Sequence, residues 1–385
     1  MRILMLVISN VAIDTRVMRE AAALADAGHA VHVIGKDVSG GYEPPKGVTV
    51  SSVGAGSAFR REGSESLGAR RKLPPHLRAA RWLLLPQHRN SAFKGWRDKA
   101  GVMAETLEFD VVHVHDFNAL ELGVHLAAKR NVPYVYDTHE LWQGRPRVGR
   151  PSPVRKRRER GKEKLWGRGA AVVITVGQGV ADELQSMYGW QPVTVVRNTF
   201  PLPESGPVEP PASCSGAVYA GRIAPFRELE AIADASELVK PLKIVIAGPA
   251  DDTYLGAYGP KAAELRGAMP VEEVDALLRS LGISLITHSD RWLNHRLAMP
   301  NKLFHAVRAG VPVVATDVQE LRRVVEEHKL GVLYKAGDGA SLAAALREVA
   351  ENYATYAANV RAAAPELSWE RDAKVLTSIY EGIPG

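Results

Sequence analysis

The sequence predicts an α/β protein built from two doubly wound units, each a parallel sheet covered by helices on both faces. Three observations lead to this prediction. Short, almost wholly apolar runs alternate with amphipathic segments along most of the 385 residues, as is typical of strands buried on both faces of a parallel sheet. The alternation stops at a proline-rich stretch in mid-chain and then restarts. A chain of this length is also long enough for two hydrophobic cores.

The first unit, residues 1–200, opens with the apolar run RILMLVIS and an amphipathic segment that ends at Gly28. Glycine directly after the last apolar residue is a common helix stop. Within the segment, apolar side chains repeat at helical spacing, at Val17, Ala21, Leu24 and Ala25. Further strands are expected at 29–35, 110–116, 133–140, 170–176 and 192–198, and further helices at 118–130 and 179–189.

Residues 201–213, PLPESGPVEPPAS, hold five prolines and no apolar periodicity, so they predict a linker. The second unit, residues 214–366, resumes the alternation. Strands are expected at 216–222, 242–248, 283–289 and 331–337 and in the run that ends at Asp317, with helices at 228–239, 271–281 and from Asn301. The last segment, residues 367–385, holds an amphipathic helix over 367–383, and its pattern leaves open which unit it covers.

Composition restricts the function further. The net charge is +6, but residues 1–200 carry 30 basic and 19 acidic side chains, against 19 and 24 in the remainder. This asymmetry predicts that the first unit meets something anionic. Neither a zinc-finger spacing nor an aromatic-plus-basic RNA motif occurs, so we expect no nucleic-acid partner. The single cysteine, Cys214, rules out an internal disulfide and makes a cytoplasmic location the default expectation.

Polar residues follow many of the expected strands. Ligands of open α/β sheets bind beyond the carboxyl ends of the strands, which makes these residues site candidates. Asn301 and Lys302 begin a helix, where free backbone N–H groups can hold an anion. Neither a GxGxxG turn nor a phosphate-binding P-loop is present, which argues against a dinucleotide site. The residues after strands include His115, Asp116, His139, Glu140, Asn198, Arg222 and Gly248.

Six motifs in order resemble the retaining GT-B glycosyltransferases of family 4, in the glycogen-synthase-like clan. They are HVHD (113–116), YDTHE (136–140), VVRN (195–198), YAGRIAPFRELE (219–230), the block PNKLF…AGVPVVATD (300–317) and SWE (368–370). The resemblance implies two Rossmann-like domains that face each other across a cleft, with the terminal helix crossing back to the first. It also implies transfer of a hexose from a nucleotide-diphosphate sugar, UDP or GDP, to a carbohydrate or lipid-linked acceptor, which could be a glycolipid, a polysaccharide precursor or a secondary metabolite. No metal or other cofactor is implied.

The resemblance assigns roles to individual residues. His115 would lie beside the transferred sugar as the catalytic residue. The donor diphosphate would be held by Arg222, Arg227, Asn301 and Lys302. The nucleoside would lie against His305, Met269 and Gly248. Weaker candidates for contact with the sugar or acceptor are Asp14, Arg16, Asp116, His139, Glu140 and Asn198.

The sequence departs from the family pattern at several positions. Leu297 and His305 stand where the family has paired glutamates, the second of which usually binds the ribose hydroxyls. A neutral imidazole offers one acceptor and one donor in place of a carboxylate. Glu228 replaces a glycine usual after the phosphate-binding cation. The first loop lacks the usual Gly-Gly turn and carries Asp14 and Arg16 instead.

Two basic segments, residues 60–99 and 145–168, mix arginine and lysine with tryptophan. One interpretation is a solvated helix face; the other is peripheral docking on an anionic membrane or acceptor.

Two other functions compete with the glycosyltransferase interpretation. One is a nucleotide-sugar epimerase of the same shape, and the other is a non-catalytic binding or scaffold subunit.

Overall fold

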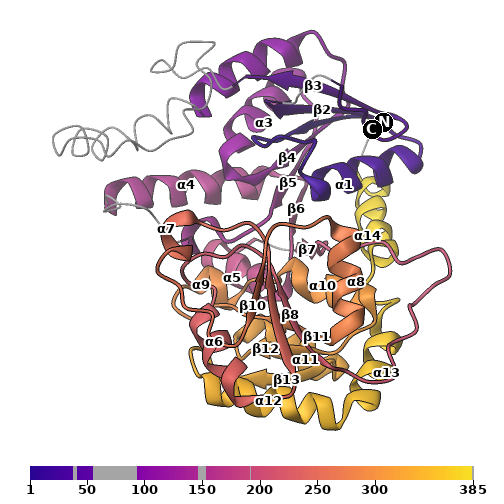
Figure 1. Ribbon diagram of the computed structural model, residues 1–385. Coiled ribbons are helices and arrows are strands. Elements are labelled where there is room, and N and C mark those ends of the chain that lie inside the picture. The colour runs from indigo at the N-terminus through magenta and orange to yellow at the C-terminus, as the bar shows by residue number, and fades with distance from the viewer. Residues whose placement is uncertain (38–40, 55–92, 146–152, 191, 384–385) are drawn as a thin grey trace.

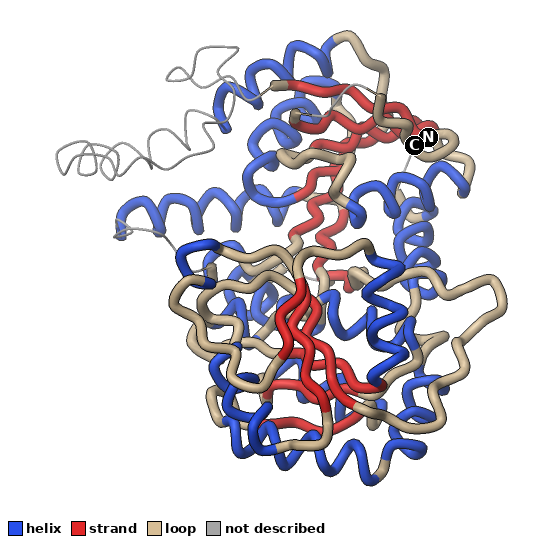
Figure 2. Tube along the Cα trace, in the orientation of Figure 1, coloured by secondary structure: helices blue, strands red, loops and turns tan. Residues whose placement is uncertain are grey.

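The computed structural model describes residues 1–37, 41–54, 93–145, 153–190 and 192–383. Two sheets, each with helices on both sides, lie one above the other in Figure 1, and Figure 2 shows the strands at the centre of each layer. Both sheets are parallel throughout, because every registered strand pair runs in the same direction. The expected α/β class with two doubly wound units is therefore confirmed.

The sheet of the N-terminal domain has the order β3-β2-β1-β4-β5-β6-β7. The order reverses between β1 and β4, which is where ligands of doubly wound sheets bind. Its strands are β1 (Arg2–Leu6), β2 (Ala30–Lys36), β3 (Val48–Val53), β4 (Val111–His115), β5 (Tyr134–Thr138), β6 (Val172–Thr175) and β7 (Val193–Val195). Its helices are α1 (Thr15–Asp26), a helix over 93–105, α3 (Asp116–Arg130), the 3-10 turn η1 (Trp142–Gly144), α4 (Pro153–Gly169) and α5 (Gln178–Tyr188).

The sheet of the C-terminal domain has the order β10-β9-β8-β11-β12-β13, which reverses between β8 and β11. Its strands are β8 (Gly216–Ala220), β9 (Lys243–Ala247), β10 (Glu264–Arg266), β11 (Gly282–Ile286), β12 (Val313–Thr316) and β13 (Gly331–Tyr334). Its helices are α6 (Leu229–Leu238), α7 (Asp252–Leu255), α8 (Val271–Leu281), α9 (Leu293–Arg296), α10 (Asn301–Ala309), α11 (Gln319–His328), α12 (Gly339–Glu351) and α13 (Tyr353–Ala363).

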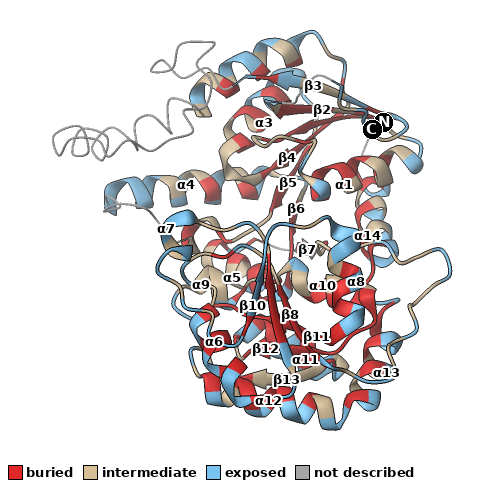
Figure 3. Cartoon of the chain, viewed as in Figure 1, coloured by how far each residue is buried: buried red, intermediate tan, exposed pale blue. Residues whose placement is uncertain are grey.

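Each sheet divides its domain into two hydrophobic cores, because successive side chains of a strand point to opposite faces. Leu4 and Leu6 pack with Trp96 on one face of the first sheet. Ile3 and Met5 pack on the other face, beside α1. Figure 3 shows the same arrangement, with buried residues along the strands and on the inner sides of the helices.

The last helix, α14 (Trp369–Glu381), packs against the N-terminal domain although it follows the C-terminal domain in sequence (Figure 1). Trp369, Leu376 and Tyr380 belong to the same core as Ile3 and Met5. The hydroxyl of Tyr380 lies 2.5 Å from Nδ1 of His113 on β4. These contacts show that the terminal helix covers the N-terminal domain, which the amphipathic pattern had left open.

Several elements were not expected from the sequence. The strand β10 has three exposed residues and lies at the sheet edge, so it carries no apolar run. The strand β3 is also an edge strand with polar residues at its centre. The helix α4 lies in what the sequence suggested only as a basic segment, because few of its side chains are buried. The helices α11, α12 and α13 were likewise not singled out. Residues 60–92 and 146–152 of the two basic segments lie outside the described residues.

Candidate active site

The carboxyl ends of the two sheets meet at the domain interface, where polar contacts join them. The side chain of Asn294 on α9 accepts a hydrogen bond from the backbone N–H of Leu141 (3.0 Å) and donates one to Glu140 (2.8 Å). Asn198 donates to the side-chain oxygen of Asn301 (2.8 Å). The candidate residues that follow strands in the two domains are thus brought together.

A buried polar cluster lies at the carboxyl ends of β4 and β5. The carboxylate of Asp137 is its centre, and the guanidinium of Arg16 on α1 contacts both Asp137 oxygens at 3.1 and 3.2 Å. Arg16 also pairs with Glu20, one turn along α1, at 2.9 Å, and donates to the carbonyl of Val196 at 2.9 Å. Arg16 is only 4% exposed. The expectation that Arg16 contacts the sugar or acceptor does not fit this placement, because Arg16 is buried and both terminal nitrogens of its guanidinium contact groups inside the domain.

The histidines of the HVHD and YDTHE motifs surround the same carboxylate. Nδ1 of His115 and Nε2 of His139 each lie 3.4 Å from Oδ2 of Asp137, and Nε2 of His113 lies 3.8 Å away. His115 is fully covered, whereas the side chain of His139 is 21% exposed. In this conformation the predicted catalytic His115 is therefore buried against the partly exposed His139, with Nδ1 of His115 lying 3.2 Å from Nε2 of His139.

Four of these buried side chains could serve as metal ligands, since the oxygens and nitrogens of Glu20, His113, His115 and Asp137 all lie within 4.8 Å of one another. Imidazole and carboxylate are ligands that zinc accepts. Here the guanidinium of Arg16 supplies positive charge in direct contact with both carboxylates. The residues fit an ion-paired cluster without a metal, and the expectation of no metal stays a prediction.

The electrostatics of the cluster follow from burial and from the charges beside each group. Burial would raise the pKa of Asp137, but Arg16 and His139 outweigh it and hold the pKa well below its usual range. Burial raises the pKa of Glu20 to about 8 against the effect of Arg16. Burial and the neighbouring His113 lower the pKa of His115 to about 3. At neutral pH the cluster therefore holds an ionised Asp137 beside a neutral His115.

The loop after β8 carries the cations predicted to hold the donor diphosphate. Arg222 is exposed, Arg227 is partly exposed, and the carbonyl of Arg227 accepts a hydrogen bond from Thr287 (2.5 Å). Phe226 and Glu228 flank Arg227 with φ angles of 65 and 57 degrees, a left-handed conformation that non-glycine residues rarely adopt. This explains why glycine is usual at the position of Glu228. Strain of this kind gathers at functional loops.

Lys302, at the start of α10, reaches the same loop. Its ammonium lies 4.9 Å from the ring centre of Tyr219 and 3.1 Å from where a Cβ of Gly221 would stand. Burial and the charge of Arg227 lower its pKa to about 8. Gly248 is required by packing, because a Cβ there would lie 2.1 Å from the carbonyl oxygen of Gly221. Lys302 and Arg227 thus form a positively charged group at the sheet edge.

The other predicted residues have structural partners. Asp14 caps α1 by accepting from the backbone N–H of Val17 (3.4 Å). Asp116 begins α3 and accepts the backbone N–H of His139 (3.0 Å). The ring of His305 packs 4.1 Å from that of Phe200, and its Nδ1 lies 3.5 Å from Asp275.

Two hydrophobic residues singled out in the sequence, Met269 and Leu297, lie in or against the hydrophobic cores. Met269, just before α8, packs against the C-terminal core. Leu297 is buried against the core of the N-terminal domain.

Several polar residues at this edge were not recognised in the sequence. His288, two residues after β11, is buried, and its Nδ1 has no partner among the described residues. Burial, Lys302 and Arg227 lower its pKa well below the usual value. Position after a strand was the signal that could have found it. Glu20 could have been found from its spacing of four residues from Arg16 on one helix.

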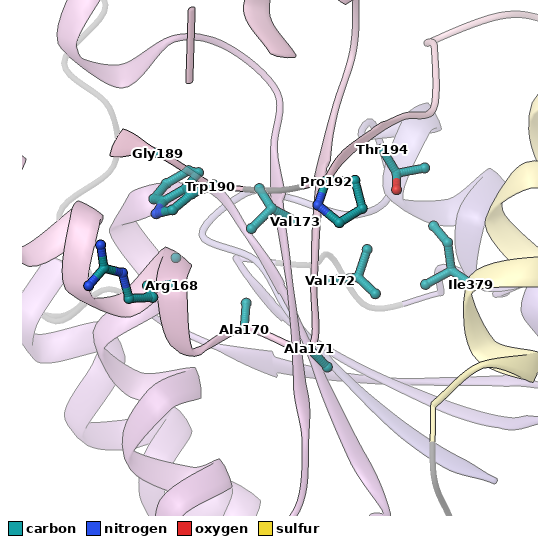
Figure 4. A pocket seen from close by; sticks show the side chains of 11 residues that line it. Arg168, Ala170, Ala171, Val172, Val173, Gly189, Trp190, Pro192, Thr194 and Ile379 are labelled. Carbon is teal, nitrogen blue, oxygen red and sulfur yellow. The ribbon is translucent and has the colours of Figure 1, made fainter. Parts of the chain in front are cut away.

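A cavity of about 420 Å³ lies away from the candidate site (Figure 4). It is lined by Val172 and Val173 of β6, Pro192 and Thr194 beside and on β7, and Trp190. These are the amino ends of the two strands, so the cavity lies at the opposite sheet edge from the candidate site.

Comparison with known proteins agrees with this geometry. The model of the family described as Glycosyltransferase Family 4 matches residues 13–202, and that of Glycosyl transferases group 1 matches residues 215–352. One model corresponds to each domain. The chain is a glycosyltransferase of the GT-B fold.

This glycosyltransferase is 26% identical to a glycogen synthase of Mycobacterium tuberculosis, over 70% of this chain and 68% of the relative. It is also 26% identical to a D-inositol 3-phosphate glycosyltransferase of Xylanimonas cellulosilytica, over 71% and 72%.

Among solved structures, a sucrose-phosphate synthase from Thermosynechococcus elongatus has a TM-score of 0.71 at 14% identity, covering 99% of this chain and 98% of that one. Anabaena HepE in complex with UDP-glucose has a TM-score of 0.66 at 16% identity, covering 99% and 98%.

Proposed function

We propose that this glycosyltransferase is a retaining, metal-independent enzyme that moves a hexose from a nucleotide-diphosphate sugar to a carbohydrate or lipid-linked acceptor. The observation that carries the proposal is the pair of cations Arg227 and Lys302 at the carboxyl edge of the second sheet, in the domain whose Asn294 contacts Glu140 of the other domain. Positive side chains on one domain suit a diphosphate, and polar groups on the other suit hydroxyls. The complex of Anabaena HepE with UDP-glucose supports UDP as the first nucleotide to test.

In the proposed reaction, the bond between the sugar C1 and the diphosphate oxygen breaks, and the bond from C1 to the acceptor oxygen forms on the same face. Negative charge gathers on the leaving diphosphate, where Arg227 and Lys302 stabilise it. The acceptor proton passes to a phosphate oxygen. No enzyme nucleophile is assigned. His115, which is fully covered in this conformation, would contact the sugar once the side chains packed on it shift.

Loss of a cation tests the diphosphate site. Each charge-assisted phosphate contact is worth about 1.5–3 kcal/mol, so Lys302→Ala should weaken UDP binding by roughly ten- to a hundredfold. Arg222→Ala should weaken it in the same direction. Lys243→Ala is the matched control, because Lys243 is exposed at the amino end of β9. Calorimetry with UDP, GDP and ADP measures the change in affinity and identifies the nucleotide base that the protein prefers. Unaltered affinity in both site variants would discard the site.

Turnover separates an enzyme from a binding subunit. An active transferase releases some free sugar from its donor, so we expect slow glucose release from UDP-glucose that Lys302→Ala reduces. Proton NMR of the transferred sugar then reports whether the anomeric configuration is kept. A protein that binds UDP but releases no sugar from any nucleotide sugar would be the binding subunit instead.

We also propose that α4 docks the enzyme on an anionic membrane surface. Arg157 and Arg158 are exposed, and the apolar side chains of Val154 and Leu165 are 77% and 69% exposed on the same helix. No described helix is long and apolar enough to span a bilayer. Basic residues with exposed apolar neighbours favour attachment to a surface of anionic lipid.

Vesicle sedimentation tests this docking. Binding to phosphatidylserine vesicles should be strong at low salt and fade as salt rises, because the Debye length shortens. Arg157→Glu with Arg158→Glu should reduce it, whereas Arg279→Glu, on α8 of the other domain, should not. Equal binding to neutral vesicles, or no binding to anionic ones, would mean that α4 is a solvated helix that does not dock on membranes.

A further inference from the structure

Three polar side chains form a hydrogen-bonded row that crosses the domain interface and ends beside Lys302. Arg19 on α1 donates from Nη2 to Oδ1 of Asn198, which lies shortly after β7. Nδ2 of Asn198 in turn donates to Oδ1 of Asn301, the first residue of α10, at 2.8 Å. The row therefore links a cation of the N-terminal domain to the helix start beside the proposed diphosphate site.

Arg19 determines the direction of both hydrogen bonds. A guanidinium has donors only, so the amide atom of Asn198 that faces it is the oxygen. The amide nitrogen of Asn198 then faces Asn301 and requires an acceptor, which within that amide only the oxygen supplies. Turning either amide round would set two donors against each other.

Packing holds Arg19 in place within the N-terminal domain. Its guanidinium carbon lies 4.7 Å from the ring centre of Phe200 and 5.7 Å from that of Trp369. Aromatic rings attract a cation placed over their faces. The backbone N–H of Trp369 donates to the carbonyl of Phe200 at 3.0 Å and so joins the two aromatic residues. Arg19 and Asn198 are thus a fixed pair, which the C-terminal domain meets at Asn301.

The row leaves one polar group of Asn301 free. Its oxygen is engaged by Asn198, whereas its Nδ2 has no hydrogen-bond partner among the described residues, and the side chain is exposed. An amide nitrogen can donate to a phosphate oxygen, while an amide oxygen in the same place would repel it. The orientation that the row imposes is therefore the one that suits an anion.

We propose that Arg19 is a positioning residue for the donor diphosphate, which acts through Asn198 to hold the amide of Asn301 with its Nδ2 towards the phosphates. Arg19 thereby contributes to diphosphate binding from the other domain without touching the diphosphate. The inference rests on the proposed diphosphate site at Arg227 and Lys302.

A double-mutant cycle on UDP affinity, measured by calorimetry, tests this role. Arg19→Met keeps a long side chain against Phe200 and Trp369 but has no donor, so it should weaken UDP binding about three- to tenfold. In the Asn301→Ala background the same substitution should change affinity by less than about twofold, since no amide is left to orient. Arg371→Met, which removes an exposed cation of α14, is the control and should leave affinity unchanged.

Equal losses in the two backgrounds would overturn the proposal. Direct attraction between the charge of Arg19 and a diphosphate does not need the amide of Asn301, so it would persist in the Asn301→Ala protein. An affinity unchanged by Arg19→Met would overturn the proposal as well.

A second break in the row keeps the test independent of any folding defect in one variant. Asn198→Ala should weaken UDP binding as much as Arg19→Met, and the two together no further, whereas additive losses would contradict a linear row. Solution X-ray scattering of Arg19→Met should give the wild-type radius of gyration, because Glu320 and Asn294 still join the domains. A larger radius would mean that the row only holds the domains together.

Lys302→Ala separates this inference from the proposed function. If Lys302→Ala weakens UDP binding while Arg19→Met does not, the positioning role alone fails. If neither variant alters UDP binding, the diphosphate site itself fails.

Discussion

At the scale of single residues, Lys302 shows how burial prepares a side chain for an anion. Burial and the charge of Arg227 disfavour its ammonium and lower the pKa to about 8. A bound diphosphate would favour the charged form and raise that pKa again. The residue is therefore expected to couple nucleotide binding to proton uptake.

This coupling predicts a pH dependence of UDP binding. Below pH 8 Lys302 is already charged, and above it binding must add a proton, so affinity should fall by up to about tenfold per pH unit. Calorimetry in two buffers of different ionisation enthalpy measures the proton uptake. Lys302→Arg keeps its charge at all these pH values and should flatten the dependence. An equally steep profile in that variant would assign the proton to another group.

His305 is a second residue whose neighbours affect how a substitution would act on ribose recognition. Its single neutral hydrogen bond to a ribose would be worth about 0.5–1.5 kcal/mol, so wild type should prefer UDP over 2′-deoxy-UDP by less than about tenfold. His305→Glu alone would face Asp275, whose oxygen lies 3.5 Å from Nδ1 of His305, and like charges would destabilise the protein.

The double variant His305→Glu with Asp275→Asn should therefore discriminate more strongly than wild type. Calorimetric affinities for both nucleotides decide the question, with Asp275→Asn alone as the control. A hundredfold preference for UDP already present in wild type would mean that another residue recognises the ribose.

At the scale of elements, α14 packs the C-terminal end of the chain against the N-terminal domain. Arg197 and Thr199, just after β7, contact the buried Asp372 near the start of the helix at 3.1 and 2.6 Å. Leu376 is fully covered by the N-terminal core. The helix is therefore part of the N-terminal domain, and it should unfold with that domain.

Truncation of one side chain tests this. Leu376→Ala should destabilise the N-terminal domain by about 2–5 kcal/mol, through lost burial and the cavity left behind. Chemical denaturation, together with hydrogen exchange of β4, measures the effect. Ser378→Ala, which is exposed on the same helix, should change stability by less than about 0.5 kcal/mol. A loss equally small for Leu376→Ala would mean that α14 docks without supporting the domain.

At the scale of the whole molecule, a buried carboxylate holds the two domains together. Glu320 on α11 accepts backbone N–H groups of Gln178 (3.1 Å) and Gly179 (2.9 Å) at the start of α5. It is 1% exposed and also pairs with Arg323 at 2.7 Å. The positive end of α5 stabilises the negative charge. Glu320 therefore favours the closed arrangement of the domains.

Two substitutions should open the molecule. Glu320→Gln removes the charge, and a Cβ in Gly179→Ala would lie 2.8 Å from Glu320 and 3.0 Å from Leu297. Loss of charge-assisted bonds worth about 1.5–3 kcal/mol should raise the open fraction ten- to a hundredfold. Solution X-ray scattering should show a larger radius of gyration. The control is Glu327→Gln, exposed on the same helix. Unchanged scattering in both variants would rule out that Glu320 holds the two domains together.

The sequence predicted much of the fold because the signals are local. Apolar runs and helical spacing identified most strands and helices around β1, β4, β8 and β11, and residues following strands identified the edge that carries the site. Edge strands such as β3 and β10 carry weak patterns, so they were missed. The helix α14 was recognised, but its apolar face fits either domain, and only the family resemblance implied that it crosses back to the first.

By itself, the sequence determined that the chain alternates strand and helix in two units and that histidines, carboxylates and cations stand at the carboxyl ends of the strands. Only the tertiary structure decided which of them face outward. Arg16 is buried in an ion pair with Asp137, and His115 is buried against His139. Arg16 and Asp137 are 121 residues apart in the chain. Burial and pKa depend on such long-range neighbours, and no local pattern encodes them.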